Sequence, residues 1–248
     1  MRVVPRRYGP TGGPHKAYFR GMLDRYRAKQ PGASLGSLFL YSLARRSANL
    51  FYRIFYRIRV EGAEHVPAAG SVIIASNHQS NFDPPAIASS IDHRNLDFIA
   101  KVELFKPPLS WLIRGLNSIP VRGSAADTAS IKEVITRLEQ GRATLIFPEG
   151  SRTTDGQIKE FQRGVMLLVK RAAAPVLPCA IEGPFAAWPR GGKVKLFSGI
   201  RFRVKFGKPI PHAELMALGN DGALERLRTE IQALHEQIRA GGPPVPGG

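Results

Sequence analysis

The stretch VIIASNHQSNFDPP occupies residues 72–85, and its character changes abruptly in the middle. The first part is short, apolar and rich in β-branched residues, which predicts a buried β-strand at 72–76. Polar residues follow, and Asp83-Pro84 is typical of a helix start, with Asp as the N-cap and Pro at the first helical position. The stretch therefore predicts a strand–turn–helix unit with His78 and Asp83 in the turn, where open α/β sheets bind their ligands.

Outside this unit, strand-like and helix-like segments alternate along the chain. Strands are expected at 57–61, 72–76, 96–100, 117–121, 143–147 and 176–181, with two more within 193–206. Helices are expected at 35–58, 84–90, 109–114, 126–140, 161–172 and 221–239. Such alternation predicts an α/β fold in which helices flank a largely parallel, mixed sheet.

The expected domain organisation follows from composition. The α/β domain spans residues 59–240, and a helical segment precedes it at 16–58. The ends, residues 1–15 and 241–248, are rich in Gly and Pro and are expected to be disordered; the first of them is also basic.

Charge is the unusual feature of the composition. The 36 Lys and Arg residues outnumber the 19 Asp and Glu residues, for a net charge of +17. Such a surface suits an anionic partner, which leaves nucleic acid, an anionic bilayer and phosphorylated substrates open. A single cysteine, Cys179, excludes an intramolecular disulfide and a cysteine-based zinc site. The chain has no stretch of about 18 uncharged apolar residues, so an ordinary transmembrane helix is not expected.

The expected helix at 35–58 is amphipathic. At about 100° per residue, its arginines 45, 46, 53 and 57 share an arc of about 120°. Large apolar residues take the other side: Leu40, Leu43, Leu50, Phe51, Ile54, Phe55 and Ile58. One interpretation is a helix in the membrane interface with its arginines toward anionic headgroups. The other is a core-packing helix whose charged face is solvated. The basic, aromatic segment 15–29 adds support to the first.

Three of the expected strands end in polar loops. Asn77-His78 follows the strand at 72–76, Arg122-Gly123 follows 117–121, and Pro148–Thr153 follows 143–147. In a parallel sheet these loops share one edge, so their side chains are expected to converge.

The His78–Asp83 pair has a specific chemical potential. A carboxylate that accepts from one imidazole nitrogen leaves the other nitrogen as a base. No serine or cysteine in the sequence is clearly paired with His78 and Asp83, so such a pair would deprotonate a substrate hydroxyl and not a serine of the protein. The alternative is that Asp83 is simply an N-cap.

The loop around Glu149 offers a second possible site. Gly150 gives room for close approach, Ser151 supplies a hydroxyl, and Arg152 can grip a phosphate with two hydrogen bonds. The alternative is an ordinary turn with a surface Glu–Arg pair.

Together the two loops resemble the glycerolipid acyltransferase family, the 1-acylglycerol-3-phosphate acyltransferases and their relatives. The family's first motif, Asn-His-x4-Asp, is matched by Asn77, His78 and Asp83, and its third motif, Phe-Pro-Glu-Gly-x-Arg, by Phe147, Pro148, Glu149, Gly150 and Arg152. Residues 101–104, Gly115 and residues 119–121 resemble the lead-in to the second motif, and residues 176–180 resemble the fourth motif. The resemblance covers about residues 58–210. The chain departs from the second motif, because Arg122 directly follows Val121 where one residue usually intervenes.

The resemblance implies roles for these residues. His78 would be the general base on an acceptor hydroxyl, and Asp83 would orient it. The phosphorylated acceptor would be held by Glu149, Gly150, Ser151, Arg152, Arg122 and Lys101. Because of the departure in the second motif, Arg114 and Arg152 are alternatives to Arg122.

The resemblance also implies a reaction and its setting. The hydroxyl would attack an acyl thioester directly, with acyl-CoA or acyl-carrier protein as co-substrate and no metal or bound cofactor. The expected acceptor is the sn-2 hydroxyl of lysophosphatidate, giving phosphatidate; another lysophospholipid or an acylated amino-acid lipid is the alternative. The enzyme would sit peripherally on an anionic membrane at its cytoplasmic face. The rivals are a basic nucleic-acid-binding protein, for which no recognisable module is present, and a membrane-binding protein without catalysis.

Overall fold

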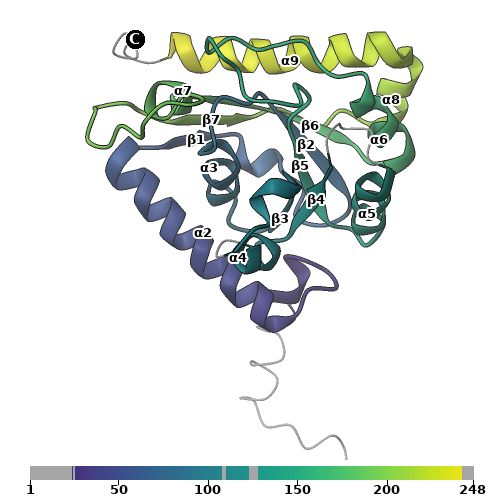
Figure 1. Cartoon of the computed structure of the whole chain (residues 1–248). Coiled ribbons are helices and arrows are strands. Elements are labelled where there is room, and N and C mark those ends of the chain that lie inside the picture. Colours follow the sequence, from purple (N-terminus) through teal and green to yellow (C-terminus); the bar gives the residue numbers. More distant parts are fainter. Residues whose placement is uncertain (1–23, 25, 108–109, 123–127, 242–248) are drawn as a thin grey trace, which may run out of the picture.

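The computed structural model describes residues 24, 26–107, 110–122 and 128–241 (Figure 1). Within these residues the core is a seven-stranded sheet in the order β1-β7-β6-β2-β5-β3-β4. Its strands are β1 (Arg59–Glu61), β2 (Val72–Ser76), β3 (Leu96–Lys101), β4 (Ser118–Val121), β5 (Ala143–Ile146), β6 (Val176–Glu182) and β7 (Arg203–Phe206). All neighbours are parallel except β6 and β7, which are antiparallel. This mixed, largely parallel sheet confirms the predicted fold class.

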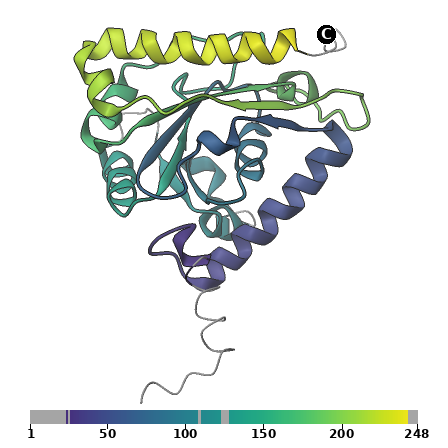
Figure 2. The same cartoon turned by 180° about the vertical axis from the view of Figure 1, so that it is seen from behind.

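Helices cover both faces of the sheet. They are α2 (Leu35–Tyr56), α3 (Asp83–Ser89), α4 (Ser110–Gly115), α5 (Thr128–Glu139), α6 (Gly164–Ala172), α7 (Pro184–Ala187), α8 (His212–Ala217) and α9 (Gly219–Ala240). Short 3₁₀ turns lie at Ala63–His65 and Val102–Leu104. The long helices α2 and α9 lie on opposite sides of the sheet in both views (Figures 1 and 2).

Strand β2 shows how the sequence builds the two layers. All five of its residues are buried, and successive side chains point to opposite faces. Ile74 packs in the cluster that includes residues of α2 and α3, and Ile73 packs in the cluster formed by α5, α6 and α9. Each isoleucine is fully buried and stabilises the fold by roughly 1.5–3 kcal/mol. The continuous apolar run, without polar alternation, is what a strand covered on both faces requires.

Most expected elements are present with ends shifted by a few residues, but the prediction of two strands within 193–206 is wrong. Only β7 forms there, and every residue from Arg190 to Gly199 is exposed. Strand β6 already has β2 on its other side, and its pairing with β7 uses only 203–206. Strand formation depends on pairing with a neighbouring strand, and the sheet formed by the described residues places none beside 190–199. The predicted disorder of 1–15 and of the tail after Gly241 lies outside the described residues.

Helix α2 is confirmed, but its faces are divided differently from the prediction. Its buried stripe consists mainly of Leu38, Tyr41, Ser42, Tyr52 and Tyr56. The side chain of Arg45 is also inward, only 8% exposed, and donates to the carbonyl of Ile91 and to Asp92. The outer stripe mixes large apolar and cationic side chains: Leu35, Phe39, Leu43, Leu50, Ile54, Arg46, Arg53 and Arg57. The tyrosines take the buried side, so the apolar and cationic residues share the outer one.

No helix within the described ranges is both long enough and apolar enough to cross a bilayer.

Candidate active site

The predicted convergence of loops at one sheet edge is present. Strands β2, β5, β3 and β4 are consecutive in the sheet and parallel, so their carboxyl ends lie on the same side. His78 follows β2 and Glu149 follows its direct neighbour β5. Lys101 ends β3 opposite Val121, and Arg122 follows β4. The candidate residues thus lie along the edge at which such sheets bind ligands.

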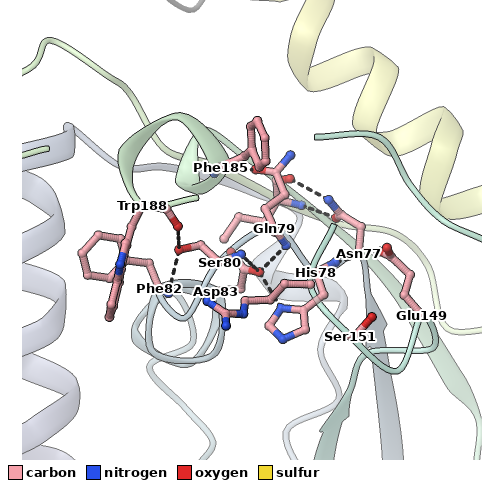
Figure 3. Close-up of polar contacts among 12 residues, drawn as sticks. Asn77, His78, Gln79, Ser80, Phe82, Asp83, Glu149, Ser151, Phe185 and Trp188 are labelled. Carbon is pink, nitrogen blue, oxygen red and sulfur yellow. Dashed lines mark hydrogen bonds and ion pairs between the residues drawn. The ribbon is translucent and has the colours of Figure 1, made fainter. Parts of the chain in front are cut away.

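His78 and Asp83 form a direct pair (Figure 3). His78 Nδ1 lies 2.7 Å from Asp83 Oδ2. The same oxygen accepts from the backbone N–H groups of Gln79, at 2.5 Å, and of Ser80, at 2.7 Å. The N-cap position belongs to Phe82, and helix α3 begins at Asp83 itself. The N-cap interpretation of Asp83 is therefore wrong: its carboxylate turns back to the 78–80 turn.

This arrangement favours one tautomer of the neutral imidazole. Because Asp83 Oδ2 is an acceptor, Nδ1 of His78 carries the proton in that tautomer and Nε2 keeps its lone pair. Asp83 is completely buried, and burial raises its pKa, while the hydrogen bonds from His78, Ser80 and Gln79 oppose that rise. His78 keeps 17% of its side chain exposed, so a substrate has access to it. The pair can therefore act as a general base.

The loop after β5 holds the histidine from its other side. The Phe147 ring stacks on the His78 ring, with centroids 3.9 Å apart and planes 16° apart. The His78 N–H donates to Glu149 Oε1 at 2.8 Å, and the His78 carbonyl accepts from the N–H of Thr153 at 2.8 Å. Ring stacking limits rotation of the imidazole, and the two backbone bonds fix its main chain. The two loops that the sequence singled out thus form one site.

Glu149 is an internal brace of this site. It is 2% exposed, and its second carboxylate oxygen accepts from the N–H of Lys159 at 3.1 Å. Burial raises its pKa, and the N–H groups of His78 and Lys159 oppose the rise. Next to it, Gly150 has φ of +69°, a conformation that favours glycine, and a Cβ there would lie 3.0 Å from Gln162 Cγ. Direct contact of Glu149 or Gly150 with substrate stays a prediction.

The cations of the edge are less deeply placed. Arg152 is half-buried, and within the described residues its guanidinium has no hydrogen-bond partner. Lys101 and Arg122 are exposed, and Arg114 lies over the Phe105 ring at 5.3 Å. The proposed phosphate-binding roles of Arg152, Lys101 and Arg122 stay predictions, and so does the contribution of Ser151.

Lys159 is a cation that sequence reasoning missed. Its ammonium donates to the hydroxyl of Ser151 and to the carbonyls of Ser151 and Arg152. It thereby closes the loop that follows β5. Its position eight residues beyond Ser151, in a segment without regular structure, gave no sequence signal.

Asn77 also has a structural role that its motif position did not reveal. Its side-chain amide donates to the carbonyl of Ile181 at 3.0 Å and accepts from the N–H of Ile181 at 2.9 Å. The amide therefore continues the pairing of β2 with β6 by one step beyond the last strand residue. His78 leaves the sheet from this fixed point.

A third buried group ties the site to the last helix. Gln79 donates through its amide to Glu182 Oε2 at 3.0 Å and accepts from the N–H of Phe185 at 3.3 Å. Glu182 also pairs with His235 of α9. Burial alone would raise the pKa of Glu182, but the hydrogen bond and charge of His235 hold this pKa below its usual value. His235 is more than 150 residues from Gln79, so only the fold could bring these groups together.

Comparisons with known proteins show which family the chain resembles. A family model described as Acyltransferase matches residues 57–182, a range that contains both loops. The chloroplastic 1-acyl-sn-glycerol-3-phosphate acyltransferase LPAT1 of Arabidopsis thaliana is 26% identical over 81% of this chain and 54% of its own length. The 1-acyl-sn-glycerol-3-phosphate acyltransferase of Bacillus subtilis is 28% identical over 73% of this chain and 86% of its own. The chain thus spans about half the length of the plant relatives that it matches.

A solved structure shares the fold. The crystal structure of the 1-acyl-sn-glycerophosphate (LPA) acyltransferase PlsC from Thermotoga maritima superposes with a TM-score of 0.73 and 24% identity. The match covers 91% of this chain and 90% of that one. Since the family model spans just over half of the chain and contains both the His78–Asp83 pair and the Glu149 loop, the protein belongs to the acyltransferase family.

Proposed function

We propose that the protein transfers a fatty acyl group from a thioester donor to the sn-2 hydroxyl of lysophosphatidate, giving phosphatidate. The observation that carries the proposal is the His78–Asp83 pair, braced by the Glu149 loop, with Nε2 of the imidazole left as a base. The two relatives described above, both named 1-acyl-sn-glycerol-3-phosphate acyltransferases, support this choice of acceptor. Acyl-CoA and acyl-carrier protein both stay open as donors.

The proposed chemistry runs through the substrate's own hydroxyl. Nε2 of His78 takes the proton of the sn-2 hydroxyl as the oxygen attacks the thioester carbonyl carbon. The tetrahedral intermediate then collapses, the C–S bond breaks, and the thiolate leaves and takes the proton from Nε2. Asp83 stabilises the imidazolium between the two transfers. The donor is an activated thioester and the base is a histidine, so the proposed mechanism uses no metal or bound cofactor.

Nearby nucleophiles of the protein are poorly placed for an acyl-enzyme. The Ser80 hydroxyl donates to the carbonyl of Trp188 at 2.8 Å, not to an imidazole nitrogen. Cys179 is completely buried, and burial raises the pKa of its thiol, which disfavours the reactive thiolate. Both observations support direct attack by the acceptor.

The acceptor's phosphate needs cations, and the sheet edge supplies them. Arg152 lies one residue before Thr153, whose N–H is bonded to the carbonyl of His78. Its half-buried guanidinium is therefore our first choice for the phosphate, with Arg122 and Lys101 from the neighbouring strands as further cations.

We further propose that the enzyme works on a membrane surface through the outer stripe of α2. That stripe exposes Phe39, Leu50 and Ile54 by 60% or more, and its arginines suit anionic headgroups. The cytoplasmic leaflet carries the negative surface potential that attracts such arginines, so we place the protein peripherally on that side. Tyr52 and Tyr56 of α2 are part of the core, so the helix cannot be deleted without opening the fold.

An acceptor panel tests the proposal. Purified protein with acyl-labelled CoA, and separately with acyl-carrier protein, is offered lysophosphatidate, other lysophospholipids and acylated amino-acid lipids. We expect labelled phosphatidate as the main product with at least one donor. Absence of transfer to any lysophospholipid would refute the function, and transfer to a different acceptor would refute the assigned substrate.

A second arm of the same experiment tests direct attack. The protein is incubated with labelled donor but without acceptor, and intact mass is measured. We expect no mass increase by one acyl group, and a stoichiometric acyl adduct would contradict the mechanism.

A further inference from the structure

The loop between α7 and β7 has an unusual surface. Every residue of its central part, Arg190–Gly199, is exposed, and the sequence of this part is RGGKVKLFSG. Val194 is 41% exposed, Leu196 43% and Phe197 82%. Three cations and no acidic residue accompany them. A short segment that presents both apolar and cationic side chains to the outside differs from an ordinary surface loop, which is polar.

The loop is held in a defined shape against the body of the protein. The Lys195 N–H donates to the carbonyl of Ala187 at 2.8 Å, and the Lys195 carbonyl accepts from the Tyr56 hydroxyl at 3.2 Å. The Trp188 indole donates to the carbonyl of Gly192 at 3.1 Å. Phe197 has φ of +56°, a conformation that residues other than glycine seldom adopt. The loop thus keeps its apolar side chains outside despite a conformational cost.

The loop adjoins the carboxyl end of α2. The Phe197 ring meets the ring of the half-buried Phe55 edge to face, with centroids 4.9 Å apart. Both cartoon views show the loop beside the carboxyl end of α2 (Figures 1 and 2). Ile54, exposed by 60%, precedes Phe55 and lies about 100° around the helix axis from it, on the outer stripe. The loop and this end of α2 are therefore neighbours that both expose apolar side chains, although more than 130 residues separate them.

Charge points to one kind of partner for this surface. Neither α2 nor the 190–199 loop contains an Asp or Glu, whereas the loop contributes Arg190, Lys193 and Lys195 and the helix end adds Arg53 and Arg57. Cations around exposed apolar side chains match the interface of an anionic bilayer, where headgroups meet hydrocarbon. An acidic protein would use the cations but would leave the protruding Phe197 ring without a hydrocarbon environment.

We propose that the 190–199 loop is a second membrane contact, which inserts Phe197 and Leu196 into an anionic bilayer beside α2. This inference rests on the membrane association proposed above and adds a second point to it. Two contacts fix the tilt of the protein on the membrane, whereas a helix alone leaves rotation about its axis free. The loop leads directly from Trp188, whose carbonyl holds Ser80 and whose ring lies 5.0 Å from that of Phe82. Docking of the loop therefore positions the catalytic turn relative to the bilayer.

Vesicle partitioning tests the proposal. Full-length wild type, Phe197→Ala and Leu218→Ala are sedimented with vesicles of phosphatidylcholine and phosphatidylglycerol. Leu218 is a matched control, because it is 47% exposed but lies at the joint of α8 and α9. Loss of a phenyl ring that is buried in the bilayer is expected to weaken partitioning by roughly tenfold or more. The Leu218→Ala control is expected to partition as wild type. Equal partitioning of Phe197→Ala and wild type would overturn the proposal.

A depth measurement provides an independent readout. Phe197→Cys is labelled with a fluorophore at position 197, since the native Cys179 is buried. Lipids brominated on the acyl chain are expected to quench this label and to leave a label on Leu218→Cys unquenched. An unquenched label at 197 would contradict insertion. If Phe197→Ala instead lost binding to acyl-carrier protein, or formation of a dimer, while its partitioning was unchanged, the loop would be a protein-docking site and the proposal would be wrong.

Activity in detergent separates this inference from the proposed function. With lysophosphatidate dispersed in micelles, Phe197→Ala is expected to turn over as wild type, because only membrane docking has been removed. Vesicle binding that depends on Phe197 in a protein without acyl transfer would leave this inference standing and refute the proposed function. Acyl transfer by a protein whose vesicle binding does not depend on Phe197 would refute only the membrane contact proposed for the loop.

Discussion

Two regions of the molecule differ in where they place polar and apolar side chains. One is the catalytic turn, residues 77–83, which carries His78 and Asp83; the other is the outer surface of α2 together with the 190–199 loop. In the turn, Asn77, Gln79, Ser80 and Asp83 are polar yet almost completely buried, and each is hydrogen-bonded to backbone. On the outer surface, apolar side chains such as that of Phe197 are exposed and do not pack in the core. Buried polar groups that are paired give a rigid site, and exposed apolar groups suit the membrane attachment proposed above. The proposed function, with a substrate that arrives in a membrane, needs both.

The largest expected effect is on kcat/KM and comes from a change in the catalytic turn. Asp83→Asn keeps an oxygen for the N–H groups of Gln79 and Ser80 and for Nδ1 of His78, but it removes the negative charge that stabilises the imidazolium. We expect kcat/KM to fall by about 10²–10⁴, the range that general-base catalysis contributes. Thermal unfolding by circular dichroism serves as the folding control. A folded variant within tenfold of wild type would show that the pair is structural only.

The second prediction tests the charge contribution of α2 to the proposed membrane attachment. Arg53→Gln with Arg57→Gln takes two cations from the carboxyl end of α2, and each cation near an anionic membrane contributes about 1 kcal/mol. We expect partitioning onto anionic vesicles to weaken by roughly 30-fold, with little change on neutral vesicles. Equal losses on both kinds of vesicle would mean that charge is not what the helix contributes.

A smaller effect is expected where α9 reaches the catalytic turn. Glu182→Leu removes the acceptor shared by Gln79 and His235, so the turn should lose part of its support. We expect kcat to fall by about tenfold with KM nearly unchanged. Glu182→Gln keeps an acceptor for Gln79 and should restore most of kcat. If both variants lost activity equally, or if KM alone rose, positioning through Gln79 would be refuted.

The smallest effect concerns stability against pH. The folded-state pKa of Glu182 lies below the ordinary value of 4.5, so its ionised form stabilises the fold above that value. This stability is lost as pH falls from about 4.5 through the lowered folded-state pKa. The Tm advantage of wild type over Glu182→Gln should therefore shrink in that range. An advantage that grew on acidification would contradict the assigned sign.

Sequence and structure agree best where short-range pattern and parallel topology decide the outcome. The run at 72–76 is apolar throughout, so its burial as a central strand could be predicted, and a parallel sheet brings the loops after β2 and β5 together. The His78–Asp83 pair is part of one short turn, and it too was visible in the sequence.

The errors lie where long-range neighbours decide. The Lys193–Phe197 segment alternates like a strand, but in the part of the chain that the structure describes no strand lies beside it. Asp83 precedes a proline as N-caps do. Its carboxylate nevertheless accepts hydrogen bonds from the preceding turn, because three donors of residues 78–80 converge there. The Glu182–His235 pair joins β6 to α9, and no local pattern could have matched these two residues. Helical periodicity sorted the side chains of α2 by polarity, but the tyrosines that pack against the sheet determine which side is buried.

The most direct test of His78 as the base is a comparison of two histidine variants. His78→Ala removes the base, and His65→Ala removes a histidine that is bonded to the carbonyl of Phe206 away from the catalytic turn. With acyl-CoA and lysophosphatidate in micelles, we expect His78→Ala to lose at least about 10²–10⁴ in kcat/KM, and His65→Ala to stay near wild type. A folded His78→Ala protein that turned over at the rate of His65→Ala would contradict the central role of His78.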